Sequence, residues 1–385
     1  MKMADLNELR IKMDEADRDL IDALQRRMEI AEQIGYFKKG SGKAIYDAKR
    51  EREKLAAIYD SADDRTKPYV SPVYSLLFEI SRGLQSRINK IESDEVRIID
   101  DAVSEMDSKP FPERAVVACQ GVEGAFSQVA CEKVFKIPSI MFMRNFSQVF
   151  SAIEAGLCKY GVLPVENSNA GTVSAVYDLM IANSFKIVRS VRVKVDHCCL
   201  MNKGSKLSDI KEVISHEQAI NQCRGFIKSL GPDVKVTYYQ NTAEAAKFVS
   251  ESGRKDICCL SSVKCAELYG LDVIKEAVQD SGNNYTRFIV ISKALEIYPG
   301  ANRTSMMMIL KHEPGALYKV LAFFYSRGIN LVKLESRPLP GRDFEFMFYF
   351  DLETSIYTDG FAQMIAELDS MSMEYRYLGS YTEVI

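Results

Sequence analysis

Two basic residues interrupt an apolar stripe near the start of the chain. Leu20, Leu24 and Ile34 fit the three- and four-residue steps that place side chains on one face of a helix. Arg27 and Lys38 fall on the same face. A buried charge is strongly unfavourable unless a partner compensates for it. Either these long side chains reach past the stripe to solvent, or they bind an anion or a carboxylate.

More polar residues gather on the next two predicted helices. Asp47, Arg50 and Glu51 share one face, and Asp47 and Arg50 have the spacing of a surface ion pair. Ser81 and Gln85 lie four residues apart within an apolar stripe, where surface pairing does not explain them. This set is either a structural network or a pocket for a small, multiply charged ligand. The number of positive groups favours the pocket.

Polar residues also cluster at the ends of predicted strands farther along the chain. Glu166, Asn167 and Ser168 place an acid, an amide and a hydroxyl on one strand-to-helix loop, and helix capping accounts for Ser168 alone. Thr286 opens a strand that should return from a second lobe to the first, although threonine also simply favours β-structure. Other polar residues at such positions are Thr172, His216, Gln222 and Arg287.

The last segment holds two short motifs. Gly315 follows a proline at the start of a predicted helix, where a ligand can approach backbone N–H groups; a plain capping turn is the alternative. Ala316 and Leu317 come next. The second motif ends a strand and consists of Glu335, Ser336, Arg337 and Pro338.

Four segments of different character position these residues. Residues 1–92 predict a helical domain, whose three helices cannot bury their stripes alone, so we expect a dimer. An acidic linker, 93–113, follows. Residues 114–295 alternate short strands with helices, which indicates a two-lobed α/β domain. Residues 303–385 have the β-α-β-β-α-β order of a small α+β, ferredoxin-like domain.

The expected elements can be placed more closely. The first helix should end near Lys39, the second begin near Asp47 and the third lie beyond Pro72. An extended stretch from Phe185 to Leu200 separates the two lobes, and a second strand-helix series begins near Glu212. In the last segment we expect strand 304–310, helix 316–327, strands 329–337 and 344–350, helix 360–370 and strand 373–379. Phe344, Phe346, Phe348 and Phe350 should share one face of a half-buried strand.

The bulk composition limits the classes of molecule that the protein is expected to bind. Fifty basic and 53 acidic residues give a net charge of −3, without a long basic run, so nucleic acid and anionic membrane are poor partners. No apolar stretch approaches about 18 residues, which predicts a cytoplasmic protein without a membrane span. Nine cysteines without a C-x-x-C pair predict reduced, buried thiols. His197, His216 and His312 lack zinc-site spacing, so we expect no catalytic metal.

The polar set of residues 1–92 resembles that of the all-helical chorismate mutases. These enzymes rearrange chorismate to prephenate, a unimolecular Claisen shift, by selecting a compact conformer and stabilising charge on the breaking ether oxygen. The resemblance implies that Arg27 and Arg10, the latter from a partner subunit, bind the two carboxylates. It also implies that Lys38 and Gln85 donate to the ether oxygen. It further implies that Glu51 and Asp47 hold the substrate hydroxyl and a backbone-supported part of the pocket. Arg50 would complete the electrostatics of the pocket, and Ser81 would contact a carboxylate.

The strand-end motifs resemble those of prephenate dehydratase over roughly residues 114–292. That reaction expels carbon dioxide and hydroxide from prephenate and forms aromatic phenylpyruvate. The resemblance implies that Thr286 supplies the essential hydroxyl, that Glu166 or a water chain shares the proton, and that Arg287 binds a carboxylate. The remaining residues of this candidate site are Asn167, Ser168, Thr172, His216 and Gln222.

The two motifs of the last segment look like those of the ACT regulatory domain, which binds phenylalanine at a dimer interface and inhibits the enzyme. All three segments together resemble the bifunctional chorismate mutase/prephenate dehydratase family over nearly the whole chain. One position departs from the family pattern, because Glu217 follows His216 where proline is usual. The local geometry there stays open.

The resemblance implies an enzyme of phenylalanine biosynthesis that uses no cofactor. Its small molecules would be chorismate, prephenate and the effector phenylalanine, and it would form at least a homodimer. One alternative is a dehydratase that prefers arogenate, the amino acid counterpart of prephenate. Another is a non-catalytic amino acid sensor, which would need neither Thr286 nor the charges on the helical stripe.

Overall fold

The computed structural model describes residues 5–89, 94–106, 108–339, 341–342 and 345–385. The chain forms two compact units. The first unit combines Met1–Ile98 with Met307–Arg376, and the second combines Ile99–Met306 with Tyr377–Ile385. In the described part of the chain, no helix is both long and apolar enough to cross a membrane.

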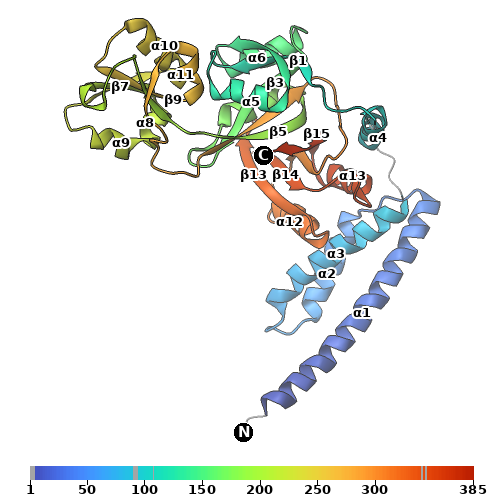
Figure 1. The fold of residues 1–385 in the computed structure, drawn as a ribbon. Coiled ribbons are helices and arrows are strands. Elements are labelled where there is room, and N and C mark those ends of the chain that lie inside the picture. Colours follow the sequence, from blue (N-terminus) through green and yellow to red (C-terminus); the bar gives the residue numbers. More distant parts are fainter. Residues whose placement is uncertain (1–4, 90–93, 107, 340, 343–344) are drawn as a thin grey trace. The chain divides into compact units, whose positions relative to one another are not determined.

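The first unit begins with three helices, α1 (Leu6–Ser41), α2 (Ala48–Ser61) and α3 (Lys67–Asn89) (Figure 1). The third helix starts before Pro72, not beyond it as the sequence predicts. Pro72 lacks one N–H donor, and here this removes a single helical hydrogen bond without ending the helix. The close approach of α1 to α3 depends on Gly35, since a Cβ there would come within 2.8 Å of the Ile88 side chain.

The predicted linker contains a helix, α4 (Asp94–Met106). Ile99, Ala102 and Met106 are its buried residues, and their spacing of three and four places them on one face. The acidic composition of this stretch therefore hides an amphipathic helix, which the linker prediction missed.

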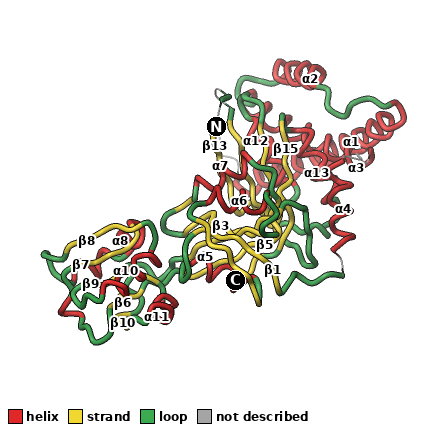
Figure 2. The backbone as a smooth tube through the Cα atoms, turned by 90° about the horizontal axis from the view of Figure 1, so that it is seen from above, coloured by secondary structure: helices red, strands yellow, loops and turns green. Residues whose placement is uncertain are grey.

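The second unit has two lobes, each a sheet with helices packed on it (Figure 2). The first lobe holds a sheet of order β16-β5-β11-β3-β1-β2, with β4 paired to β3. Its strands are β1 (Arg114–Gln120), β2 (Ile137–Met143), β3 (Tyr160–Asn167), β4 (Gly171–Thr172), β5 (Lys186–Lys194), β11 (Tyr285–Ser292) and β16 (Glu383–Val384). Its helices are α5 (Phe126–Val134), α6 (Phe146–Glu154) and α7 (Ser174–Ala182).

The second lobe holds a five-stranded sheet of order β10-β6-β9-β7-β8. Its strands are β6 (Cys198–Met201), β7 (Glu212–His216), β8 (Lys235–Tyr239), β9 (Ile257–Ser261) and β10 (Asp272–Lys275). Its helices are α8 (Glu217–Gln222), α9 (Arg224–Ser229), α10 (Thr242–Ser252) and α11 (Val263–Tyr269), with a short 3₁₀ turn at Leu207–Asp209. The extended stretch 185–200 is thus two strands in different sheets, and the predicted two-lobed α/β architecture is confirmed.

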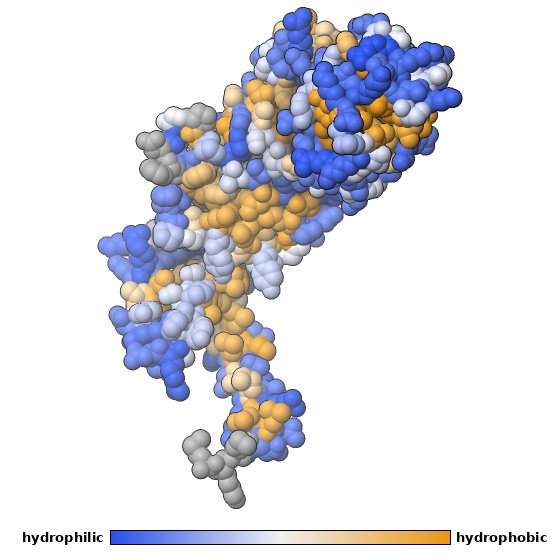
Figure 3. Space-filling model, turned by 90° about the vertical axis from the view of Figure 1, so that its left-hand side faces the viewer, coloured by the Kyte–Doolittle hydropathy of each residue, from blue (hydrophilic) through white to orange (hydrophobic). Residues whose placement is uncertain are grey.

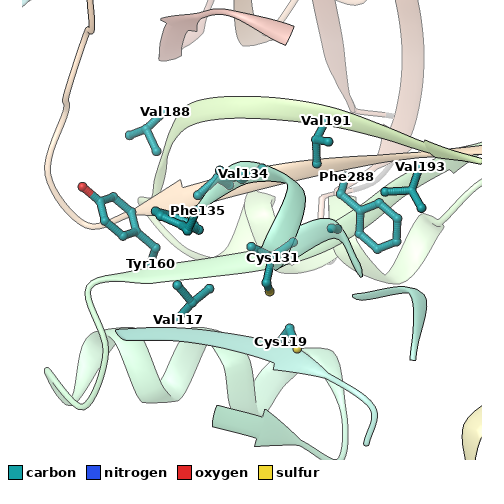
Figure 4. Close-up of a cluster of buried hydrophobic side chains, with 13 residues drawn as sticks. Val117, Cys119, Cys131, Val134, Phe135, Tyr160, Val188, Val191, Val193 and Phe288 are labelled. Carbon is teal, nitrogen blue, oxygen red and sulfur yellow. The ribbon is translucent and has the colours of Figure 1, made fainter. Parts of the chain in front are cut away.

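The core of the first lobe lies between its sheet and α5 (Figure 4). Val117 and Tyr160 come from β1 and β3, and Cys131 comes from α5; all three are fully buried. Alternating apolar residues on these strands give the sheet a hydrophobic face, which the helix covers. The rigid sheet holds the strand ends that carry the candidate dehydratase residues.

The C-terminal segment contains the six elements in the predicted order. They are β12 (Arg303–Ile309), α12 (Ala316–Ser326), β13 (Asn330–Pro338), β14 (Phe346–Glu353), α13 (Phe361–Met371) and β15 (Glu374–Tyr381), and the sheet order is β13-β14-β12-β15.

The phenylalanines of β14 do not form the buried face along its whole length. Met347 and Tyr349 are buried on the opposite face, whereas Phe346 is exposed and Phe348 half-buried. Phe350 is buried, and Phe344 lies outside the described residues. Phe346 and Phe348 are less buried because they line a cavity beside the start of α12.

Candidate functional site

The guanidinium of Arg27 lies against α3. It donates to the Ser81 hydroxyl at 2.5 Å and to the Leu77 carbonyl at 3.0 Å. Burial lowers the pKa of Arg27, although electrostatic interactions with Tyr74 and Glu51 oppose this shift. Two predicted residues from different helices, Arg27 and Ser81, are therefore in direct contact, and the half-buried Arg27 is held against α3.

Lys38 lies at the other end of the same stripe. Its ammonium donates to the Ile45 carbonyl at 2.6 Å, in the turn that leads to α2. Burial lowers its pKa, and the carboxylates of Asp47 and Glu51 work against that shift. Asp47 itself caps α2 and accepts from the backbone N–H of Arg50 at 2.9 Å. The structure thus uses Asp47 as a helix cap that binds the Arg50 backbone, whereas their spacing alone would also allow a surface ion pair.

Arg82 is a residue that the sequence interpretation missed. Its guanidinium forms ion pairs with Glu51 on α2 and with Glu79 on α3, and it lies 5.0 Å from the centre of the Tyr46 ring. Burial opposes its charge, but attraction to Glu79 and Glu51 outweighs this and raises the pKa of Arg82. Its position next to Ser81 was the only available signal.

A cavity of about 570 Å³ in the first unit is lined by Lys38 and Arg82 together with residues of the C-terminal segment, and its wall does not include Arg27, Ser81 or Gln85. Basic side chains outnumber acidic ones in its wall. The basic ones are Lys38, Lys39, Lys43, Arg82, Lys311 and Lys319, and the acidic ones are Glu79, Glu313 and Glu367. A cavity of this size and charge suits a small ligand with more than one carboxylate.

The remaining helical candidates lie at different depths. Gln85 is buried on α3, four residues after the buried Ser81. Arg50 and Arg10 are both exposed, and Arg10 lies near the N-terminal end of α1. The single chain therefore assembles the cationic cavity without Arg10.

In the second unit, strand pairing brings two predicted motifs together. β11 runs antiparallel to β3, with Thr286 opposite Asn167 and Arg287 opposite Glu166. β4 adds Thr172 opposite Glu166 on the other edge of β3. The prediction that the Thr286 strand returns to the first lobe is confirmed.

The Asn167 side chain has a fixed orientation. Its Oδ1 accepts from the backbone N–H groups of Asn169 and Ala170, at 3.1 and 2.9 Å. Its Nδ2 therefore faces the other way and donates to Thr286 Oγ1 at 3.0 Å and to Asn284 Oδ1 at 2.8 Å. Because the Thr286 oxygen accepts this bond, its own hydrogen points elsewhere, which suits a group that donates to a substrate oxygen.

Ser168 and His216 have mainly local partners. The Ser168 hydroxyl donates to the Asn283 carbonyl at 2.9 Å and accepts from the backbone N–H of Tyr285 at 3.0 Å. His216 caps α8, its Nδ1 accepting from the backbone N–H of Gln218 at 3.2 Å. Glu217 follows as the first residue of α8, where its negative charge favours the positive end of the helix dipole.

A cavity of about 500 Å³ opens beside these residues. Its wall includes Asn169, His216, Gln222 and Asp280. Gln222 belongs to the second lobe, and its Oε1 accepts from Asn284 Nδ2 at 3.0 Å. Asn284 is fully buried. The sequence analysis did not predict a role for it, because in the sequence nothing distinguishes it from any loop asparagine before a strand.

In the C-terminal segment, Gly315 has φ +82° and caps α12. This left-handed conformation favours glycine. Gly315, Ala316 and Leu317 line a cavity of about 350 Å³ together with Phe346 and Phe348. The second motif lies on β13, where Glu335 and Arg337 are half-buried and Ser336 and Pro338 are exposed.

The chain joins a helical domain to an α/β domain, and each domain contains one of the two polar sites. Two sequence families identify these domains as a mutase domain and a dehydratase domain. The family "Chorismate mutase type II" matches residues 9–86, and the family "Prephenate dehydratase" matches residues 117–296.

Individual relatives agree. The chain is 37% identical to arogenate dehydratase/prephenate dehydratase 2, chloroplastic, of Arabidopsis thaliana over 280 residues, which covers 70% of this chain and 73% of that protein. It is 28% identical over 386 residues to the bifunctional chorismate mutase/prephenate dehydratase of Escherichia coli, covering 97% of this chain and 95% of that protein. The chain therefore belongs to the prephenate dehydratase family, with the chorismate mutase domain of its bifunctional members.

Solved structures resemble a large part of this chain. The prephenate dehydratase of Arthrobacter aurescens in complex with L-Phe has a TM-score of 0.64 and 29% identity, covering 69% of this chain and 89% of that one. A second structure, GqqA, described as a quorum-quenching acylase, has a TM-score of 0.63 and 32% identity, covering 69% of this chain and 97% of that one.

Proposed function

We propose that this chain converts chorismate to prephenate in its helical domain and prephenate to phenylpyruvate in its α/β domain. The observation that supports this most directly is the contact between Asn167 and Thr286, which orients a hydroxyl donor and is linked through Asn284 to Gln222 in the wall of a cavity. The contact of Arg27 with Ser81, and the place of Lys38 in the wall of the cationic cavity of the first unit, support the mutase step. Neither step calls for a cofactor.

The mutase step is a unimolecular rearrangement in which one C–O bond breaks as one C–C bond forms. Arg27 binds a substrate carboxylate with help from Ser81, and Lys38 donates to the ether oxygen as it gains charge. A planar guanidinium suits a carboxylate, and a point-like ammonium suits a single oxygen. Gln85 adds a second donor, and Glu51 accepts from the substrate hydroxyl.

The dehydratase step breaks two bonds of prephenate. The electron pair of the bond to the ring carboxylate moves into the ring, carbon dioxide leaves, and the ring hydroxyl departs from the opposite end. Thr286 donates its hydrogen to that departing oxygen, and Glu166 or a water chain returns a proton to Thr286. Arg287 binds a carboxylate. Aromatisation drives the reaction, so orientation is the main task of the protein.

The C-terminal segment acts as an ACT domain of ferredoxin-like fold that binds phenylalanine and inhibits the enzyme. The cavity beside Gly315 supports this proposal, because it lies between the start of α12 and the Phe346 and Phe348 side chains. The complex of the A. aurescens enzyme with L-Phe provides a precedent for the ligand.

The chain acts as a homodimer or a larger homo-oligomer. Leu20 and Ile21 on α1 are 66% and 53% exposed, and hydrophobic patches follow this helix toward its N-terminal end (Figure 3). A second copy would bury this stripe and deliver Arg10 to the partner's cavity. We place the enzyme in the cytoplasm, since all nine cysteines are free and buried.

One experiment tests the whole proposal. The purified protein is given chorismate alone, with and without phenylalanine, and phenylpyruvate is measured by its absorbance in alkali. We expect phenylpyruvate to form, and phenylalanine to reduce it. If chorismate is unchanged, prephenate is supplied directly, and failure of that reaction as well would leave the amino acid sensor as the better interpretation.

A preference for arogenate is the second candidate, because the plant relative carries both activities in its name. The test compares kcat/KM for prephenate and arogenate on the same preparation. A ratio in favour of arogenate would assign the chain to that substrate, whereas the attached mutase, which makes prephenate, leads us to expect the opposite.

A further inference from the structure

His197 lies in the short connection between β5 and β6, where the chain passes from the first lobe to the second. Its side chain is only 3% exposed, and it packs edge-on against Phe126, with ring centres 5.8 Å apart. A buried imidazole at the crossing between two lobes requires an explanation, because histidine is costly to bury without a polar partner.

The imidazole ends a chain of hydrogen bonds that starts at Thr286. Asn167 Nδ2 donates to Thr286 Oγ1 at 3.0 Å and to Asn284 Oδ1 at 2.8 Å. Asn284 Nδ2 donates to Gln222 Oε1 at 3.0 Å, and His197 Nε2 lies 3.0 Å from the same oxygen. The chain therefore joins the first lobe, both connections between the lobes, and α8 of the second lobe.

Only one assignment of donors and acceptors fits this series of hydrogen bonds. Two backbone N–H groups fix the Asn167 amide, so Asn284 must present its oxygen to Asn167 and its nitrogen to Gln222. Gln222 then presents its oxygen, which can only accept. His197 must therefore carry its proton on Nε2. Among the described residues, His197 Nδ1 has no hydrogen-bond partner, which agrees with a neutral ring protonated only at Nε2.

We propose that His197 is a positioning residue for the dehydratase reaction. Its Nε2–H holds the Gln222 oxygen, and so leaves the Gln222 amide nitrogen to face the cavity that Gln222 lines. Through Asn284 the same bond supports the Asn167 amide, which the two backbone N–H groups orient and which holds the Thr286 hydroxyl in its donor orientation. This inference rests on the proposed role of Thr286, and it adds a residue that does not touch the substrate.

The surroundings keep the ring in this state. Burial lowers the pKa of His197, and the hydrogen bond with Gln222 and the charge of Asp196 only partly oppose that shift. Asp196 is held by Gln279, whose Nε2 donates to it at 2.7 Å while its Oε1 accepts from the His197 backbone N–H at 2.9 Å. The imidazole is thus neutral at physiological pH and fixed through its backbone.

The test compares three substitutions that differ in where they place an N–H group. His197→Gln puts an amide nitrogen near the position of Nε2, whereas His197→Asn puts it near Nδ1, short of Gln222. His197→Leu keeps the bulk and removes all donors. With prephenate as substrate, we expect kcat to fall roughly tenfold for the Asn and Leu variants and less than about threefold for Gln, with KM changing little.

A purely structural role predicts a different result. In that case all three variants would lose thermal stability and activity in proportion, and Gln would not restore kcat selectively; this outcome would overturn the proposal. Tyr298→Phe is the matched control, because it removes a buried hydroxyl that bonds to Glu296 in the same unit, outside the chain of bonds. We expect it to change stability but not kcat.

A double substitution tests the connection itself. If His197 acts through Gln222, then His197→Leu combined with Gln222→Leu should be no slower than Gln222→Leu alone. Multiplying effects would show independent roles and contradict the proposal. Thr286→Ala separates this inference from the proposed function. Full dehydratase activity in the Thr286→Ala variant would refute the proposed site. If that variant is inactive but His197→Leu remains fully active, only the role of His197 is refuted.

Discussion

The Arg82 guanidinium donates to both carboxylate oxygens of Glu51 and so joins α3 to α2 beside the cationic cavity. Glu79 binds the same guanidinium from within α3. Both carboxylates are mostly buried, and Arg82 forms an ion pair with each of them. The position of Glu51, a proposed substrate contact, therefore depends on a residue outside the predicted set.

Replacing Arg82 with methionine should impair the mutase. Leaving a partly buried carboxylate without its partner costs about 1–3 kcal/mol, so we expect mutase kcat/KM to fall by about tenfold. The rate of chorismate disappearance measures it. Arg65→Met, at an exposed position between α2 and α3, is the control and should be silent. Unchanged kcat/KM in the Arg82 variant would show that Glu51 needs no support.

Arg27→Ala should abolish mutase activity while dehydratase activity on added prephenate continues. Arg27 belongs to the first compact unit and Thr286 to the second, so removing the Arg27–Ser81 contact leaves the dehydratase residues in place. Losing one residue that binds a substrate carboxylate typically lowers the rate by several powers of ten when the reaction depends on substrate orientation. Equal loss of both activities, measured separately, would show that the two sites are not independent.

Thr286→Ala should slow the dehydratase at least about 100-fold, because positioned proton donors contribute two to four powers of ten. Thr286→Ser retains the hydroxyl and should keep much of the activity. The mutase reaction of the same protein serves as the internal control. Turnover of prephenate at the original rate in the alanine variant would remove Thr286 from the mechanism.

The neutral state of His197 predicts how stability depends on pH. Burial lowers its pKa in the folded chain from the ordinary value of 6.5, so below pH 6.5 the unfolded chain binds more protons than the folded one. This contribution to stability is complete above 6.5 and is lost as the pH falls, by at most about 1.4 kcal/mol per pH unit. Urea unfolding of the original chain and of His197→Gln at several pH values should show a shallower dependence for the variant. Parallel curves would contradict a neutral imidazole.

A charge on the exposed stripe of α1 should prevent assembly. Leu20→Asp introduces a carboxylate where a second copy is expected to pack, so sedimentation should show a smaller species and mutase activity should fall. Leu207→Asp, on an exposed residue of the second lobe, is the matched control. A dimer that persists in the Leu20 variant would place the interface elsewhere.

The sequence predicted those features that depend on periodicity and local motifs. The three long helices, the strand-helix alternation and the order of the C-terminal elements all follow from spacing, and they are present. The return of the Thr286 strand to the first lobe was also predicted, and the structure shows that this strand pairs with the one that carries Asn167. Residues 94–106 were misjudged, since acidic composition concealed three apolar positions on one helical face.

The residues that were missed have partners far away in the sequence. Arg82 meets Glu51 across 31 positions, and His197 meets Gln222 across 25. Neither residue belongs to a local motif, so only the folded chain shows what each one contacts. A histidine between two strands, or an arginine on a helix, is by itself indistinguishable from a residue on an ordinary surface.

The strand order of the first lobe has a consequence for synthesis. β11 lies between β5 and β3 in the middle of the sheet, yet the whole second lobe separates it from β5 along the chain. At about 5–20 residues per second, a ribosome needs several seconds to make that lobe. During this time the nascent sheet has a gap at its centre, with the edges of β3 and β5 unpaired. The second lobe can therefore fold while its host is still incomplete, and chaperones that protect strand edges should associate with this chain at that stage.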